Sequence, residues 1–469
     1  MTHSRTSRRL ALLATAALVG TAFAAAPVAA QGDLNVCDGE FEGPVTLTLS
    51  VHSGTNPGVY PDSVEAFNAG PGAEKGITVE LLPIPETGYE TAINAMAASA
   101  DLPDAMYMDG PFLVGFAWNG ILRAFDSCIS EDTKAGFLPS IIEQGTYDGQ
   151  LYSLGSFDSG LGLWAHKSML DEVGARIPAG PDDAWTVEEF TQVLKDLQAA
   201  GKGANGPLDI KWFYGAGEWR PYGFAPMIWS AGGDIIDRST MASSDGFFNG
   251  PEAVGAWTTF QGWVNDGLID IVAEDDNNFT VGPDTEANTG DETPISWVGH
   301  WMYPLYSENV DDLVLLPLPD FGNGSKTGMG SWNWAITTGN DGVADSGDEL
   351  DMDAVWAWVD WAISPAEVER LATGEGAIPS TLDGLAASPL HQEDGVMAMY
   401  VTNLNNAHAD TTMAQAGAVP RPNTPAYKVI RDAFSSAMAD IIAGADVQTI
   451  LDDAVRMIDQ EIEDAGYAE

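Results

Sequence analysis

Cysteine, histidine and basic residues are scarce in this chain of 469 residues, and each scarcity excludes a class of function. There are 2 cysteines, 6 histidines, and 19 lysines and arginines against 69 aspartates and glutamates, a formal net charge of −50. Nucleic acids and anionic membranes are excluded as partners, because a field this negative repels polyanions. The acids are scattered over the whole chain, which is typical of a solvated surface adapted to high salt and does not identify a ligand.

Sequence motifs of catalysis, metal binding and nucleotide binding are also missing. The chain has no G-x-S-x-G, no H-E-x-x-H and no P-loop. Gly160, Gly162 and Ala165 match the dinucleotide spacing G-x-G-x-x-A, but no helix is expected after the glycines, which favours chance. With 69 acids, some pair of carboxylates always looks suited to glycoside hydrolysis, so acids alone do not indicate an enzyme. We therefore expect no catalysis, no cofactor and no metal.

Long apolar runs are missing after residue 30, so the rest of the chain offers no candidate membrane span. Within the first 30 residues, three arginines precede an Ala/Leu/Val run from Leu10 to Ala26, which is followed by small residues. This pattern predicts a cleavable signal peptide over residues 1–30 and a periplasmic or secreted protein. The general and the twin-arginine export routes both stay open. No cysteine follows the run directly, so no lipid anchor is expected. Without the three arginines of the expected signal peptide, the chain has 16 basic and 69 acidic residues, a net charge of −53.

Apolar residues make up 45% of the chain, which indicates a folded protein long enough for two lobes, each with its own core. Cys37 and Cys128 are an even pair in a chain that we expect to be exported, and the simplest interpretation is a disulfide. Two free buried thiols are the alternative.

Strands alternate with helices in the first part of the expected mature chain. Strands are predicted at Val45–Val51, Ile77–Leu82 and Ala105–Met108, and helices at Val59–Ala69 and Tyr89–Ala100. This order predicts a parallel α/β sheet. Ligands of such sheets bind beyond the carboxyl ends of the strands, where His52, Ser53 and Asp109 would lie.

Later helices and strands are predicted from their apolar periods and end signals. Thr186 and Glu189 have the spacing of a capping box for a helix at Thr186–Ala200. Further helices are predicted at Pro251–Asn265, Asp353–Ile363, Pro365–Thr373, Pro425–Ala443 and Val447–Asp464. Short strands are predicted at 212–214, Ile295–Val298, Leu313–Pro319 and Trp332–Ile336. Loops are expected at Gly215–Tyr222 and, because it is acidic and poor in large apolar residues, at Glu274–Glu292.

The segment Tyr147–Leu170 reads as the place where the chain crosses from one lobe to the other. It begins with the turn signal Asp148-Gly149, and two apolar strands follow that are joined through small Gly and Ser residues. Asp158 lies at the joint, which suits a hinge with a polar group facing a cleft. An ordinary hairpin within one domain is the alternative.

The same segment, YDGQLYSLGSFDSGLGLWAHKSMLDEVG, resembles the extracellular sugar-binding proteins of ATP-binding-cassette (ABC) importers, the family of maltose-binding protein. The resemblance continues through AWTVEEFTQVLKDLQAAG, WSAGGDIID, NGPEAVGAW, WVGHWMYPLY, LLPLPDFGNGSKTGMGSWNWAI and AVPRPNTPAY. It implies a two-lobed periplasmic-binding-protein fold of type II, with the ligand cleft between lobes joined by crossing strands. The expected division is 31–155 and 326–388 in the first lobe, and 156–325 and 389–469 in the second.

Aromatic residues next to Gly, Pro and polar residues, in stretches expected to be loops, fit a sugar site, because a pyranose has apolar faces and a rim of hydroxyls. Trp219, Tyr222, Trp301 and Trp332 are such residues. The alternative for any tryptophan is core packing, which we expect of those in regular elements: Trp212, Trp257, Trp263, Trp356, Trp358 and Trp361.

The resemblance implies ligand contacts from both lobes, with Trp301 as a stacking platform and Asp109 accepting from sugar hydroxyls. The full set that it implies is His52, Ser53, Asp109, Asp158, Ser159, Trp219, Arg220, Tyr222, Trp301, Trp332 and Arg421. His300 stands where the family often has proline, a departure that bears on the shape of this loop. Arg421 has the alternative role of bracing the lobe interface through a carboxylate.

The resemblance implies a binding protein that delivers a sugar or oligosaccharide to the permease of an ABC importer. So few basic residues favour a neutral ligand and disfavour a phosphate. We expect a monomer. A secreted carbohydrate-active enzyme, and a binding protein for a polyol or glycerol phosphate, are the alternatives.

Overall fold

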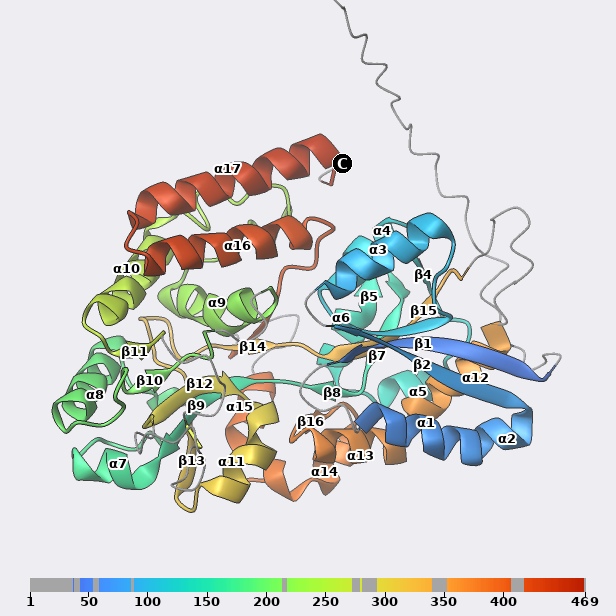
Figure 1. Ribbon diagram of the computed structural model, residues 1–469, viewed down its shortest axis with the longest axis horizontal. Helices are drawn as coiled ribbons and strands as arrows, with labels where there is room; N and C mark the ends of the chain where they lie inside the picture. Colours follow the sequence, from blue (N-terminus) through green and yellow to red (C-terminus); the bar gives the residue numbers. More distant parts are fainter. Residues whose placement is uncertain are drawn as a thin grey trace, which may run out of the picture. The chain divides into compact units, whose positions relative to one another are not determined.

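The computed structural model describes residues 37, 43–53, 59–85, 88–212, 217–271, 279–280, 293–339, 352–405 and 417–467. The expected signal peptide and nearly all of the expected acidic loop lie outside these residues. Two β-sheets organise the described chain, and each forms the centre of one lobe (Figure 1).

The first lobe is built on a six-stranded sheet in the order β2-β1-β3-β15-β4, with β7 also paired to β15. Its strands are β1 (Val45–Ser53), β2 (Ile77–Pro85), β3 (Ala105–Asp109), β4 (Leu122–Arg123), β7 (Ser153–Gly155) and β15 (Trp332–Thr337). Helices α3 (Tyr89–Ser99) and α4 (Phe112–Trp118) cover one face (Figure 1), where Met106 and Met108 are buried. Helices α1 (Val59–Ala69) and α12 (Met352–Ala362) cover the other, over Tyr107, as the alternation of a strand requires.

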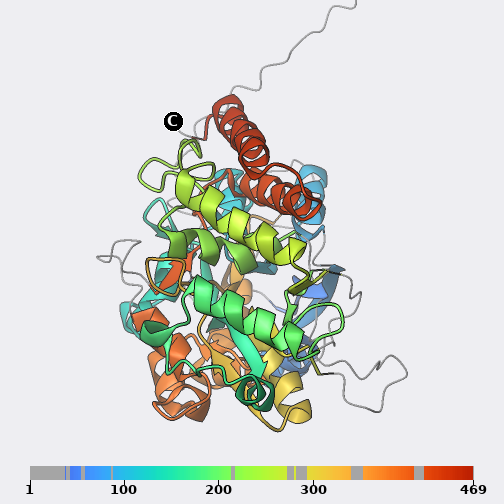
Figure 2. The same cartoon turned by 90° about the vertical axis from the view of Figure 1, so that its left-hand side faces the viewer.

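The second lobe is built on a five-stranded sheet in the order β11-β10-β12-β9-β13. Its strands are β9 (Leu161–His166), β10 (Leu208–Asp209), β11 (Ile269–Asp270), β12 (Ile295–Gly299) and β13 (Leu313–Leu316). Four helices stack on one side of it, as Figures 1 and 2 show: α9 (Trp219–Ala231), α10 (Pro251–Asn265), α16 (Tyr427–Ile442) and α17 (Val447–Ala465). Helices α7 (Lys167–Glu172), α8 (Val187–Ala199), α11 (Tyr303–Asn309) and α15 (Ala398–Asn405) complete it.

Within the described residues, the chain passes between the lobes three times, and short strand pairs join these passages to neighbouring segments. The first passage contains β8 (Phe157–Asp158), which pairs with β16 (Ile378–Pro379) after helix α13 (Pro365–Gly374). The second contains β14 (Thr327–Met329), which pairs in parallel with β17 (Ala418–Pro420). The third runs from α14 (Leu382–Ala387) to α15. The expected lobe boundaries at residues 155, 325 and 388 stay predictions.

Several sequence predictions are confirmed in detail. Thr186 forms the expected capping box with Glu189, and α8 follows it with its apolar face buried. Helices α1 and α10 have the predicted bounds. Asp148 and Gly149 both have positive φ, 47° and 74°, in the turn between β5 (Thr146–Tyr147) and β6 (Gln150–Leu151), as the Asp-Gly signal indicates. Cys37 and Cys128 form a disulfide.

Other predictions are corrected by the structure. The first sheet is mixed, because β15 returns from the second lobe and pairs antiparallel to β3. The strand expected at 212–214 lies mostly outside the described residues, and a short strand, β10, is found just before it at Leu208–Asp209. The expected loop Gly215–Tyr222 ends in helix, since α9 begins at Trp219 despite Pro221 and an internal Pro226. Pro221 is tolerated because the first helical turn has no intrahelical partner for its missing N–H.

Among the described residues, no helix combines the length and apolarity needed to span a membrane.

Candidate ligand-binding cleft

A cleft lies where the two lobes meet, which is a common place for small-molecule sites. It lies beyond the carboxyl ends of β1, β3 and β12, as the topology of α/β sheets favours. The lining residues come from both lobes and from the passages between them: His52, Tyr60, Asp109, Phe157, Ser159, Glu218, Trp219, Tyr222, His300, Trp301, Gly330, Ser331, Trp332, Glu375 and Arg421.

The second-lobe wall of the cleft is aromatic. Trp301 lies in a short 3₁₀ turn after β12, with its ring 6.1 Å from that of Tyr222 and edge-to-face with Trp219 at 5.9 Å. Gly299 lets this ring fold back over the chain, because a Cβ there would come within 2.1 Å of the indole. The Trp301 Nε1–H is buried and has no hydrogen-bond partner among the described residues. The wall therefore offers a flat apolar surface together with an unused donor.

The first-lobe wall is also aromatic. The His52 and Trp332 rings stack at 3.7 Å, and Tyr107 lies beneath them in the sheet, 5.9 Å from Trp332. His52 Nε2 is 3.1 Å from the Tyr60 hydroxyl, whereas its Nδ1 has no hydrogen-bond partner among the described residues. Burial lowers the pKa of His52 to about 4, so this ring is neutral at physiological pH.

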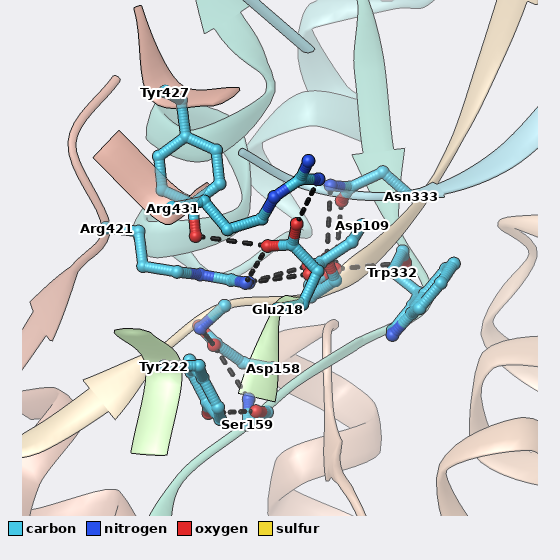
Figure 3. A network of polar contacts seen from close by, with 12 residues as sticks. Asp109, Asp158, Ser159, Glu218, Tyr222, Trp332, Asn333, Arg421, Tyr427 and Arg431 are labelled. Atoms are coloured by element: carbon cyan, nitrogen blue, oxygen red, sulfur yellow. Dashed lines mark hydrogen bonds and ion pairs between the residues drawn. The ribbon is translucent and has the colours of Figure 1, made fainter. Parts of the chain in front are cut away.

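A network of buried charges lies at one end of the cleft (Figure 3). Arg421 Nη1 and Nη2 donate to the two carboxylate oxygens of Asp109 at 2.7 and 2.6 Å. Arg421 Nη1 also reaches Glu218 Oε2 at 3.4 Å, and Arg431 Nη1 donates to Glu218 Oε1 at 2.7 Å. Arg431 in turn forms an ion pair with Glu90 of α3 at 3.1 Å. The network therefore joins acids of the first lobe to arginines of the second.

Burial and neighbouring charges compete in setting the pKa values of these groups. Burial raises the pKa of Glu218 to about 7, against the opposing effect of Arg431 and Arg421. For Arg421, burial lowers the pKa, but the carboxylate of Asp109 outweighs it and the net direction is upward. Removing one side chain of such a buried network leaves another charge buried without a partner. This loss would lower the stability of the folded protein.

Eight of the eleven residues expected to bind ligand line the cleft: His52, Asp109, Ser159, Trp219, Tyr222, Trp301, Trp332 and Arg421. The Ser159 and Tyr222 hydroxyls are hydrogen-bonded to each other at 2.5 Å. The alternative role of Arg421 in the sequence analysis was to brace the lobe interface through a carboxylate. Its ion pair with Asp109 is a contact of this kind.

Three of the expected residues do not line the cleft. Ser53, the last residue of β1, is exposed outside it. Arg220 lies over the Trp212 ring at 4.2 Å and donates to the Ser435 carbonyl at 2.8 Å, so its guanidinium points away.

Asp158 is wholly buried, and its carboxylate binds residues in and next to the passages between the lobes. Its Oδ1 accepts from the Ser159 and Gly330 backbone N–H groups at 2.8 and 3.2 Å, and its Oδ2 accepts from the Ser140 hydroxyl at 2.6 Å. Asp158 therefore holds two passages together, and the expectation that it faces ligand is wrong.

Seven lining residues were not predicted: Tyr60, Phe157, Glu218, His300, Gly330, Ser331 and Glu375. Glu218 and His300 were visible as immediate neighbours of Trp219 and Trp301. Glu375 follows α13, and no sequence pattern indicates that the carboxyl end of that helix reaches the cleft. No group of three or more His, Cys, Asp and Glu in the described part of the chain is arranged to hold a metal ion.

Solved structures share this architecture. A cyclic α-maltosyl-1,6-maltose binding protein from Arthrobacter globiformis matches with a TM-score of 0.67 and 21% identity, over 90% of this chain and 100% of that one. The maltose-bound MalE3 of T. maritima gives 0.68 and 18% over 90% and 100%. The maltotriose-bound MalE domain of Bdellovibrio bacteriovorus gives 0.69 and 17% over 89% and 100%. At these identities the likeness establishes the two-lobed fold of type II.

The sequence itself matches the family model of the bacterial extracellular solute-binding proteins over residues 62–398, which is more than half of the chain. With both lobes and the cleft between them in place, this protein belongs to the bacterial extracellular solute-binding protein family.

Proposed function

We propose that this protein is the substrate-binding component of an ABC importer, which captures a sugar or oligosaccharide outside the cytoplasmic membrane and delivers it to the permease. The observation that carries the proposal is the cleft between the lobes, where aromatic rings of the two walls alternate with hydrogen-bonding groups. Trp301 and Trp332 are suited to the apolar faces of pyranose rings, and Ser159 and His300 to the hydroxyl rim. Related proteins of this fold were solved with maltose and maltotriose, which supports an oligosaccharide.

The proposed ligand is neutral. Among the described residues that line the cleft, Arg421 is the only Lys or Arg. It is already bound at both terminal nitrogens by Asp109 and approached by Glu218. An anionic ligand such as glycerol phosphate would meet these carboxylates without a free cation to offset them.

The proposed mode of action is binding without chemistry. The protein acts as a monomer whose lobes enclose the ligand and then engage the permease. The alternative of a glycoside hydrolase is tested by incubating the protein with maltotriose and related oligosaccharides and analysing the products.

The decisive experiment is a thermal-shift screen over neutral mono- and oligosaccharides, sugar phosphates and polyols, followed by calorimetry. We expect a neutral sugar to raise the melting temperature and to be recovered unchanged. Arg220→Ala is the matched control, because this side chain lies outside the cleft and should leave the affinity intact. Stabilisation by phosphorylated ligands alone, or release of hydrolysis products, would refute the proposal.

A further inference from the structure

His300 and Glu375 meet where the two lobes approach each other, and neither uses its full hydrogen-bonding capacity within the protein. His300 follows β12 in the second lobe and Glu375 follows α13 in the first, and both line the cleft. His300 is 1% exposed, and its Nε2 has no hydrogen-bond partner among the described residues. A buried ring nitrogen without a partner is costly unless a ligand satisfies it.

The tautomer of His300 follows from its other nitrogen. Nδ1 is 3.3 Å from the backbone carbonyl oxygen of Glu375, and because a carbonyl can only accept, Nδ1 carries the hydrogen. In a neutral ring Nε2 is then an acceptor. Burial lowers the pKa of His300 to about 3, so the ring stays neutral over the physiological range. This nitrogen therefore requires a donor from the ligand.

The side chain of Glu375 has the complementary property. No hydrogen bond or ion pair is formed by its carboxyl group with any residue that the structure describes, in contrast to Asp109 and Glu218. Burial raises the pKa of Glu375 to about 7, and a protonated carboxyl can donate a hydrogen bond.

Among the described residues, the titratable groups that interact with this pair supply no positive charge. They are Tyr107 of β3, which interacts with Glu375, and His391, which interacts with His300. Asp158 of β8, next to β16, directs its carboxylate to Ser140, Ser159 and Gly330 instead. On α13 itself, Arg370 is paired with Glu367.

We propose that His300 and Glu375 form one subsite that reads a single sugar hydroxyl, which donates its hydrogen to His300 Nε2 and accepts one from the protonated carboxyl of Glu375. The inference rests on the proposed function and refines it. A hydroxyl is the group that fits, since it donates and accepts at once, whereas an ether or a methylated hydroxyl lacks the hydrogen for Nε2. When Glu375 ionises, its carboxylate and His300 Nε2 are both acceptors for a single hydroxyl hydrogen. The affinity for the sugar therefore falls.

The test is the pH dependence of sugar affinity, measured by calorimetry with maltotriose, or with the neutral sugar that binds most tightly in the screen, between pH 5.5 and 8.5. We expect an almost constant Kd at the acid end and a rise approaching about tenfold per pH unit above the titration of Glu375. Glu375→Gln should bind with a pH-independent Kd close to the acid-limit value of the wild type, because the carboxamide donates at every pH. His300→Phe should weaken binding about tenfold or more at every pH, since the acceptor is lost.

Glu218→Gln is the matched control, because burial also raises the pKa of Glu218 to about 7, and this variant should keep the pH dependence. The inference is overturned if a sugar binds with a flat pH profile, or if the profile disappears in Glu218→Gln and persists in Glu375→Gln. Should His300→Phe fail to fold, the two glutamine variants still decide. If no sugar binds at any pH, the proposed function itself fails.

Discussion

A substitution at Trp301 can distinguish stacking on the ligand from packing in the core. Its ring is only partly buried, lies against Tyr222 and Trp219, and lines the cleft. Trp301→Ala should weaken sugar binding by about 0.5 to 1.5 kcal/mol beyond the loss of contact area, with a small effect on stability. Trp257→Ala, at a fully buried tryptophan of α10, should instead lower the free energy of unfolding by about 3 to 5 kcal/mol. A large drop in melting temperature with unchanged Kd would place Trp301 in the core.

Asp158 is expected to affect stability in a pH-dependent way. Burial raises the pKa of Asp158 to about 6, above its ordinary 3.8, so the folded state disfavours the charged form. The stability that it contributes is fully present below about pH 3.8 and is lost as the pH rises through about 6. Asp158→Asn, which can satisfy the same partners, should show a flatter stability curve between pH 4 and 7.5. Asp158→Ala should be destabilised by about 1 to 3 kcal/mol, because two buried N–H groups lose their acceptor. Parallel curves for the Asp158→Asn variant and the wild-type protein in urea denaturation would contradict this interpretation.

At the level of elements, the passage after β8 is constrained by packing at Gly160. Its φ does not lie in the left-handed region, and the constraint is steric, because a Cβ would lie 2.5 Å from the Tyr400 ring. Gly160→Val should therefore destabilise the protein by about 1 to 3 kcal/mol through overpacking. Gly180→Val is the control, because a Cβ at Gly180 meets nothing within 4 Å. Equal melting temperatures for the two variants would show that Tyr400 gives way.

The disulfide ties the segment before β1 to the segment after β4. Cys37 and Cys128 are 91 residues apart, and the loop-entropy model gives about 4.6 kcal/mol as an upper guide for their contribution to stability. Reductant should lower the melting temperature of the wild type and leave that of a Cys37→Ser/Cys128→Ser variant unchanged. Labelling of two free thiols in the unfolded, unreduced protein would argue against the bond.

Helices and strands with strong local signals could be predicted from the sequence, and those shaped by tertiary packing could not. The period of Phe190, Val193, Leu194 and Leu197 and the cap at Thr186 locate α8. By contrast, α9 contains two prolines and a glycine, which predict a loop, and forms because nearly every side chain in it is buried. The residues of the cleft show the same contrast between local sequence signals and tertiary packing. His52 and Asp109 could be predicted because they lie at the carboxyl ends of strands, whereas Glu375 reaches the cleft through the packing of a helix distant in sequence.

At the level of the whole molecule, two ion pairs among the described residues join the lobes: Asp109 with Arg421, and Glu90 with Arg431. Glu90 does not line the cleft, so it can be altered without removing a ligand contact. Glu90→Gln should favour more open molecules, which solution scattering would detect as a larger radius of gyration without sugar. It should also weaken sugar binding severalfold, because part of the binding energy then drives closure. Unchanged dimensions and affinity would show that this pair does not contribute to closure.

Closure on ligand is the wider prediction. Since sugar would contact both walls of the cleft only when the lobes are together, a bound sugar should make the molecule more compact in scattering. The Glu90→Gln variant should show the larger change on adding saturating sugar. Identical dimensions with and without a sugar proven to bind would refute the closure mechanism and leave the fold assignment untouched.

Because His52 stacks on Trp332, the intrinsic fluorescence of Trp332 can report on the state of the cleft. The two rings are 3.7 Å apart, so the fluorescence of this indole should respond to any change at the imidazole face, including arrival of a sugar or separation of the lobes. Burial lowers the pKa of His52 to about 4, which keeps the imidazole uncharged and its influence on emission constant from mildly acidic to alkaline solution. Ligand titrations across that range can therefore be followed by intrinsic emission without labelling the protein.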